Sequence, residues 1–140
     1  MKAILPLIIV LLQFLGAKIA NAQADTLMKF CAKHITQDYI SDGQVYQTPI
    51  SANESAEFAV TFYGGSTYRL AACAGLEDGN LIFTVYDNDR NELFSNIDHN
   101  DSPYWDFKFS STVDCYIEAR LSDKSPYDSG FAILLIGFKN

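Results

Sequence analysis

The stretch "SAEFAVTFYGGSTYRLAAC", Ser55 to Cys73, contains the alternation that decides the fold. Large apolar residues occupy every second position from Phe58 to Phe62, and small or polar residues fill the positions between them. This period of two is that of a β-strand with one buried face. Gly64 and Gly65 follow, where a turn adopts positive φ at little cost, and a second apolar run then begins. The stretch therefore predicts two short strands joined by a turn.

The same pattern recurs along the rest of the chain. Turn-forming segments separate five further apolar runs: Leu81–Tyr86, Glu92–Ser95, Tyr104–Ser110, Asp114–Leu121 and Gly130–Phe138. Seven or eight short strands at this spacing, with no helical pattern between them, indicate an all-β protein. We expect an antiparallel, jelly-roll-like β-sandwich with a short N-terminal helix.

The parity of each run predicts which side chains face the core of the sandwich. The expected inward set is Phe58, Val60, Phe62, Leu70, Phe83, Val85, Trp105, Phe107, Phe109, Ile117, Ala119, Phe131, Ile133 and Leu135. The last run is apolar at both parities. It should therefore lie centrally in its sheet, or have its outer side covered by the N-terminal helix.

An amphipathic pattern precedes the strands. Within 25–42, apolar residues recur three and four positions apart, which is typical of a helix with one apolar stripe. Asp25 is a candidate N-cap and Gly43 a candidate stop. We therefore expect a short helical segment over 25–42 and a β-sandwich domain over 44–140.

The beginning of the chain is typical of a secretory signal. Lys2 precedes an apolar run from Ala3 to Ala17, and small residues follow it. This run is shorter than the ~20 apolar residues that a membrane span needs. We expect a signal peptide over 1–22 that is cleaved after Ala22 or Ala24. The mature protein would be periplasmic or secreted, with no stable membrane insertion.

Charge narrows the range of partners. The 140 residues include 10 Lys and Arg against 17 Asp and Glu, for a net charge of −7 at pH 7. Cleavage of the predicted signal would remove two lysines and no acid, which makes the mature chain more acidic still. Such a chain repels phosphate backbones, so nucleic acid is not an expected partner. We expect a protein or a glycan of the cell envelope.

Three cysteines fit an oxidising compartment: Cys31, Cys73 and Cys115. An odd count there suggests one disulfide and one spare thiol, and the sequence leaves all three pairings open. Three buried, unpaired thiols are an equally open alternative. No C-x-x-C motif occurs, which argues against a thioredoxin-like redox role.

The segment "DNDRNE", Asp87 to Glu92, raises the question of a calcium loop. Acids and amides fall at some EF-hand positions, but Glu92 stands where the loop needs glycine and a strand, not a helix, precedes it. The segment reads better as the tip of a β-hairpin, with Asn91 in the left-handed conformation.

A calcium site built between loops is the sharper alternative. Four carboxylates would supply it if the hairpin tip and the segment "DHND" met at one end of the sandwich: Asp87, Asp89, Asp98 and Asp101. Extracellular calcium modules of this kind bind weakly, at ~10⁻⁴ to 10⁻³ M. No other cofactor is expected.

Catalytic signals are sparse, and we expect the protein not to be an enzyme. His34 and His99 stand in no zinc-ligand spacing, and the chain has no G-x-S-x-G motif. A small envelope hydrolase is the alternative. It requires one of these histidines to lie beside an acid and a nucleophile in a cleft.

Tyrosines on the outer strand faces are candidates for sugar stacking. Tyr104 and Tyr116 have the parity opposite to that of the core residues of their strands, so both are predicted to be exposed. They are the candidate ligand-binding residues for a glycan.

The strand sequences also resemble a known family. Four segments look like successive strands of the pre-peptidase C-terminal type of β-sandwich: "EFAVTFYGGSTYRL", "LIFTVYDNDRNELFS", "STVDCYIEARL" and "SGFAILLIGF". The resemblance covers about Glu57 to Phe138, and it extends to small, uncharacterised, secreted bacterial proteins with the same closing pattern. It implies a non-catalytic accessory sandwich, some members of which bind calcium or carbohydrate. Cys73 and Cys115 depart from the pattern.

Together, these observations predict a secreted or periplasmic, non-catalytic β-sandwich that acts by binding. A weak calcium-dependent glycan- or protein-binding module and the small hydrolase are the alternatives. A structural subunit that self-associates through edge strands is a further one, and the sequence leaves the oligomeric state open.

Overall fold

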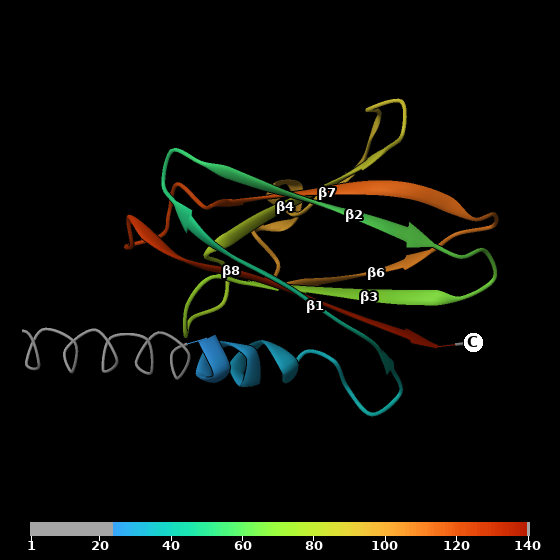
Figure 1. Cartoon of the computed structure of the whole chain (residues 1–140), viewed down its shortest axis with the longest axis horizontal. Helices are drawn as coiled ribbons and strands as arrows, with labels where there is room; N and C mark the ends of the chain where they lie inside the picture. The colour runs from blue at the N-terminus through green and yellow to red at the C-terminus, as the bar shows by residue number, and fades with distance from the viewer. Residues whose placement is uncertain (1–23, 140) are drawn as a thin grey trace, which may run out of the picture.

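Eight antiparallel strands form two four-stranded sheets that pack face to face (Figure 1). The structure is a computed structural model, and it describes residues 24–139. The strands are β1 (Ile40–Ser51), β2 (Ser55–Phe62), β3 (Thr67–Cys73), β4 (Leu81–Asp87), β5 (Glu92–Ser95), β6 (Tyr104–Lys108), β7 (Val113–Leu121) and β8 (Ser129–Lys139). A short 3₁₀ helix, η1 (Asn96–His99), follows β5.

The strand order is that of a jelly roll. Sheet A has the order β1-β8-β3-β6 and sheet B the order β2-β7-β4-β5. Each strand of one sheet is thus followed or preceded in the chain by a strand of the other, as two Greek keys wrapped into a sandwich require. The prediction of an all-β, jelly-roll-like sandwich is confirmed.

The core lies between the two sheets. Its fully buried side chains include Phe62 and Leu70 of β2 and β3, and Phe83 and Ile117 of β4 and β7. Most of the predicted inward set packs into this cluster or against it. A buried aromatic or aliphatic side chain of this kind contributes about 1.5–3 kcal/mol to stability.

The last strand is the exception to the predicted core. Leu70 of β3 pairs with Ile136 of β8, so the even-numbered residues of β8 face the core. The expected inward positions Phe131, Ile133 and Leu135 therefore lie on the other face, and this part of the prediction is wrong. Because β8 is apolar at both parities, its alternation alone does not distinguish the two faces. The expected central place of β8 is confirmed, since it lies between β1 and β3.

A helix covers the outer face of sheet A (Figure 1). Residues 24–32 are helical in the described part of the chain. Leu27, Met28 and Phe30 pack against a small second cluster that includes Ile133 of β8 and Cys73 of β3.

The helix ends at residue 32 and not at 42, so the helical prediction over 25–42 is wrong in its second half. The backbone N–H groups of His34 and Ile35 donate to carbonyls three residues earlier, at 3.1 and 3.0 Å, which tightens and ends the helix. The following loop lies directly on sheet A. A Cβ atom at Gly137 would stand 2.9 Å from Tyr39 Cβ and 3.0 Å from Ile35 Cγ2.

Strand β1 begins at Ile40, so the sandwich starts four residues before the predicted 44–140 domain. This strand was not predicted because its sequence contains Gly43 and Pro49. Gly43 has a φ of 77° at a register shift between Ser41 and Val45, which is a β-bulge. Pro49 is tolerated because β1 is an edge strand that pairs with β8 alone.

The predicted signal peptide over 1–22 lies outside the described residues. So does its cleavage point after Ala22, whereas Ala24 is the first described residue of the helix. Over the described residues, no helix combines the length and the apolar character that crossing a membrane requires.

Candidate functional site

A groove of about 860 Å³ opens beside the described helix. Its walls come from four segments that are far apart in the sequence: the helix at Thr26 and Leu27, the end of β1 with the turn after it, the loop after β3, and the start of β8 with the loop before it. Pockets of this size are typical of ligand sites. The jelly-roll topology thus brings together residues that no local motif connects.

The groove is apolar and its surroundings are acidic. Leu76 and Tyr127 line it with side chains that are 57 % and 49 % exposed. Glu54 also lines it, and the exposed Glu77 and Asp128 are chain neighbours of Leu76 and Tyr127. No lysine or arginine is among the described residues that line the groove. The site therefore offers apolar contact together with negative charge.

Gly75 lies in the loop after β3, next to the loop that carries Tyr127. Gly75 has a φ of 153°, and a Cβ atom there would lie 3.2 Å from Asn80 Nδ2 and 3.7 Å from the Tyr127 ring. The Tyr127 loop is also attached to the β1–β2 turn, because the Ala52 N–H donates to the Asp128 carbonyl at 2.8 Å. These contacts hold the Tyr127 side of the groove in place.

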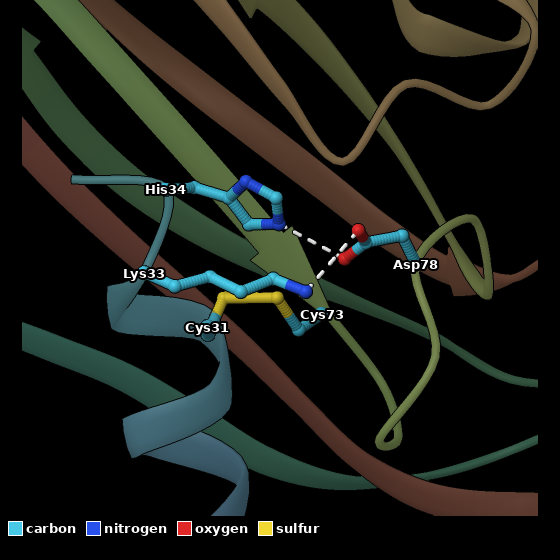
Figure 2. The surroundings of a disulfide bond; sticks show 5 residues. All are labelled: Cys31, Lys33, His34, Cys73 and Asp78. Atoms are coloured by element: carbon cyan, nitrogen blue, oxygen red, sulfur yellow. Dashed lines mark hydrogen bonds and ion pairs between the residues drawn. A yellow bond between two sulfur atoms is a disulfide. The ribbon is translucent and has the colours of Figure 1, made fainter. Parts of the chain in front are cut away.

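A disulfide and two ion pairs attach the other loop to the N-terminal segment (Figure 2). Cys31 and Cys73 form the disulfide, with Cα atoms 5.8 Å apart. Asp78 accepts a hydrogen bond from His34 Nε2 at 2.9 Å and pairs with Lys33 Nζ at 3.3 Å. Burial alone would raise the pKa of Asp78, but His34 and Lys33 lower it on balance. The loop after β3 is thus attached to the N-terminal segment at Cys73, where the loop begins, and again at Asp78.

Arg69 organises the rest of the outer face of sheet A. Its guanidinium donates to both carboxylate oxygens of Asp106, at 2.7 and 2.9 Å, and to the His34 carbonyl at 3.2 Å. It also lies 4.5 Å from the ring centroids of Tyr39 and Tyr104. The hydrogen bonds from Arg69 hold the pKa of Asp106 below its ordinary value. The cluster is therefore a closed structural network with its charges paired.

Arg90 makes a similar arrangement on the outer face of sheet B. It donates to both oxygens of Glu57, at 2.8 and 3.0 Å, and lies 4.3 Å from the Tyr116 ring centroid. The two predicted glycan residues, Tyr104 and Tyr116, therefore lie on opposite faces of the sandwich, and each has an arginine over its ring. The structure does not bring them together into one platform.

The acidic hairpin tip is held by its own turn. The Asp87 carboxylate accepts the backbone N–H groups of Asp89 and Asn91, each at 2.9 Å, and the Asn91 amide at 3.0 Å. These bonds, those from Asn91 first, hold the pKa of Asp87 below its ordinary value. The left-handed residue is Arg90, with a φ of 64°, and not the expected Asn91. Arg90 follows Asp89 in a turn closed by its own N–H to the Asp87 carbonyl at 3.1 Å.

The four candidate calcium ligands do not converge. Asp98 lies in η1, and the four residues of β5 separate η1 from the hairpin tip. A strand of four residues spans about 13 Å, which is too far for Asp98 to share an ion with Asp87. Asp101 is 6 % exposed and accepts a hydrogen bond from Ser122 Oγ at 2.8 Å. Within residues 24–139, no three His, Cys, Asp or Glu side chains are grouped so that they could hold a metal ion. Calcium binding stays a prediction. The four predicted carboxylates do not form one shared site.

The hydrolase alternative requires a histidine beside both an acid and a nucleophile, and for His34 the acid is Asp78. His34 hydrogen-bonds to Asp78 at 2.9 Å and lies 5.2 Å from the Tyr104 ring, and neither partner is a serine or cysteine nucleophile. His99 packs on the rings of Phe94 and Trp105. Burial raises the pKa of the unpaired Cys115 to about 11, which keeps it protonated.

Sequence reasoning missed the groove. Leu76 and Tyr127 lie in segments that read as polar turns, Gly75 to Gly79 and Ser122 to Ser129. The sequence signal was a large apolar side chain in each of these turns. Such a side chain is exposed to water unless another group covers it, so it can mark a binding surface.

Comparison with known proteins gives a likeness of fold and no match of sequence. No family model and no curated protein sequence matches the chain. The fold is similar to the crystal structure of Aeromonas hydrophila PliG, a periplasmic lysozyme inhibitor of g-type lysozyme, with 9 % sequence identity and a TM-score of 0.49. The match covers 74 % of this chain and 89 % of that chain. This likeness is too low to transfer the activity, and the resemblance to the pre-peptidase C-terminal sandwich stays a prediction.

Proposed function

We propose that this protein is an exported, non-catalytic binding protein whose groove beside the N-terminal helix holds a segment of a protein partner. The observation that carries this proposal is the groove itself, which combines exposed apolar side chains with acidic neighbours. Export rests on the predicted signal peptide. The absence of enzymatic activity is an expectation from the sequence.

The chemistry of the groove indicates what the partner segment contains. Leu76 and Tyr127 gain from covering by another apolar side chain, at about 25 cal/mol for each Å² removed from water. Glu54 and the neighbouring acids favour lysine or arginine on either side of that side chain. The expected segment is therefore an exposed apolar residue flanked by basic ones.

The affinity should be modest. Association costs about 4–15 kcal/mol in lost motion before any contact gives a net gain, and a single groove buries less surface than a standard protein interface. A short peptide that carries this pattern should bind with a dissociation constant of about 10⁻⁵ to 10⁻³ M. A whole partner protein would add contacts outside the groove.

Calorimetric titration with synthetic peptides tests the proposal. The probe alternates leucine or phenylalanine with lysine, and a matched peptide has glutamate in place of lysine. Leu76→Asp should weaken binding of the lysine peptide by about tenfold or more, as expected for an apolar anchor. Leu93→Asp is the matched control, because Leu93 is 46 % exposed on β5 of the other sheet. Equal binding of both peptides, or equal loss in both variants, would contradict the proposal.

A further inference from the structure

A second opening, of about 480 Å³, lies at the side of the sandwich between the edge strands β1 and β2. Its floor consists of side chains that belong to the core cluster or pack on it, including Val60, Ile136 and Phe138. Its mouth carries the polar groups of Asp42, Gln44 and others. It shares no lining residue with the groove at the end of sheet A.

The bulge in β1 places a carboxylate at this mouth. The pairing of β1 with β8 shifts between Ser41 and Val45, around the left-handed Gly43. Within the bulge, Asp42 Oδ1 accepts the backbone N–H of Gln44 at 2.8 Å. One carboxylate oxygen is thereby fixed by the backbone, and the position of the group is set by the strand.

The charge of Asp42 has no counter-ion. Among residues 24–139, no lysine, arginine or histidine forms an ion pair with it, and none lines the opening. Burial raises the pKa of Asp42 above its ordinary value. Burial first, and then the charge of Asp42, also raise the pKa of Tyr46. A partly desolvated, unpaired carboxylate of this kind gains free energy when a cation binds beside it.

Tyrosine rings surround the same space. Tyr46 and Tyr68 belong to the core cluster or pack on it, while Tyr63 is 63 % exposed at the rim. The Tyr63 backbone N–H donates to the Tyr68 hydroxyl at 3.0 Å, which links the two residues. Aromatic faces next to a carboxylate suit an organic cation, because the rings attract its charge and also contact its apolar stem.

We propose that this opening binds an alkylammonium group. The Asp42 carboxylate accepts its N–H bonds, and the rings of Tyr46 and Tyr63 contact its alkyl stem. Such a group is carried by free aliphatic amines and by the lysine side chains of proteins. This site is independent of the groove and does not rest on the proposed function.

An NMR titration of the exported chain with n-butylammonium tests the proposal, with n-butanol as the uncharged probe of the same shape. We expect saturable shifts confined to the residues around Asp42, Tyr46 and Tyr63, and binding of n-butanol weaker by about tenfold, the worth of one charge-assisted hydrogen bond. Asp42→Asn should weaken n-butylammonium binding by a similar factor. This variant keeps an oxygen for the Gln44 N–H, so the bulge is retained.

Glu54→Gln is the matched control, since it removes an exposed carboxylate from the other groove, and it should leave the titration unchanged. A thermal melt checks that each variant is folded. If Asp42→Asn is not, Tyr63→Ala at the exposed rim should still weaken binding severalfold, by the loss of one ring contact. Equal affinity for n-butylammonium and n-butanol, or equal loss in the Asp42 and Glu54 variants, would overturn the proposal.

N-acetyl-lysine amide distinguishes the two sources of the group. Tighter binding of this probe than of n-butylammonium would assign the site to a lysine side chain of a protein partner. Tighter binding of n-butylammonium would assign it to a free amine. Leu76→Asp should affect neither probe, so failure here is distinguishable from failure of the groove proposal.

Discussion

The two outer faces of the sandwich carry the same three-residue arrangement in different environments. On sheet A, Arg69 binds both oxygens of Asp106 and lies over Tyr104, and its side chain is only 15 % exposed. On sheet B, Arg90 binds Glu57 and lies over Tyr116, but its side chain is 55 % exposed. The difference arises because the helix and the loop after it cover sheet A, whereas no α-helix within residues 24–139 packs on the outer face of sheet B. The burial of the arginine, and not the types of the three residues, therefore decides how much each ion pair contributes to stability.

The same cover produces the candidate site. The groove forms beside Thr26 and Leu27, where the described helix meets the ends of β1 and β8. The disulfide and the His34–Asp78 contact hold that edge in place. The outer face of sheet A, which the disulfide and the helix cover, therefore also carries the groove. The following variants compare what the contacts on the two outer faces contribute to stability.

Removal of the disulfide should have the largest effect. Cys31→Ala/Cys73→Ala opens a loop with a sequence separation of 42, for which the chain-entropy model gives a loss of about 4 kcal/mol in the free energy of unfolding. Urea denaturation measures the loss. Cys115→Ala is the matched control in sheet B, and it should cost about 1 kcal/mol because it removes one buried sulfur and no cross-link. A double variant as stable as the wild type would show that the helix holds sheet A without covalent help.

The two arginines give the next comparison. Arg69→Met leaves the Asp106 carboxylate without its partner and removes the hydrogen bond to the His34 carbonyl, so we expect a loss of about 2 kcal/mol. Arg90→Met breaks an exposed pair and should give no resolvable change. Urea denaturation at the same pH compares them. Equal losses would show that the cover on sheet A does not strengthen its ion pair.

Lowering the pH should weaken the ion pairs of Asp106 and Asp78, and each pair should lose less stability than the substitutions above remove. The pKa values of Asp106 and Asp78 are lowered from 3.8, the former chiefly by Arg69, and the latter by His34 and Lys33 against the opposing effect of burial. The unfolded chain therefore takes up protons first as the pH falls. The stability that these groups give is complete above about pH 5 and is lost as the pH falls through their folded pKa values.

Unfolding curves measured between about pH 7 and pH 2 check this sign. Asp106→Asn should lower stability at neutral pH and flatten the acid side of the profile. Glu57→Gln on sheet B should flatten it less, because the Arg90 side chain that pairs with Glu57 is 55 % exposed and its charge is screened by solvent. A steeper acid profile in Asp106→Asn than in the wild type would contradict the assigned partner.

Alternation predicted the positions of the strands from Ser55 onward, and the jelly roll followed from their number and spacing. It missed β1 and assigned the wrong face of β8 to the core, for opposite reasons. β1 is an edge strand whose pattern is interrupted by Gly43 and Pro49, and β8 is apolar on both faces because the helix covers one of them. The groove could not be predicted because four separate segments meet there. The placement of Tyr104 and Tyr116 on different sheets could not be predicted, because parity gives the face of a strand but not the sheet to which that strand belongs.

The most direct test of the binding proposal is an NMR titration of the protein with the peptide that alternates leucine and lysine. Amide shifts should saturate around Leu76, Tyr127 and Phe131, at the covered edge of sheet A. The amides of Arg90 and Tyr116, on the open face, should not move. Saturating shifts centred on Arg90 and Tyr116, or no saturating shift at Leu76 and Tyr127, would contradict it.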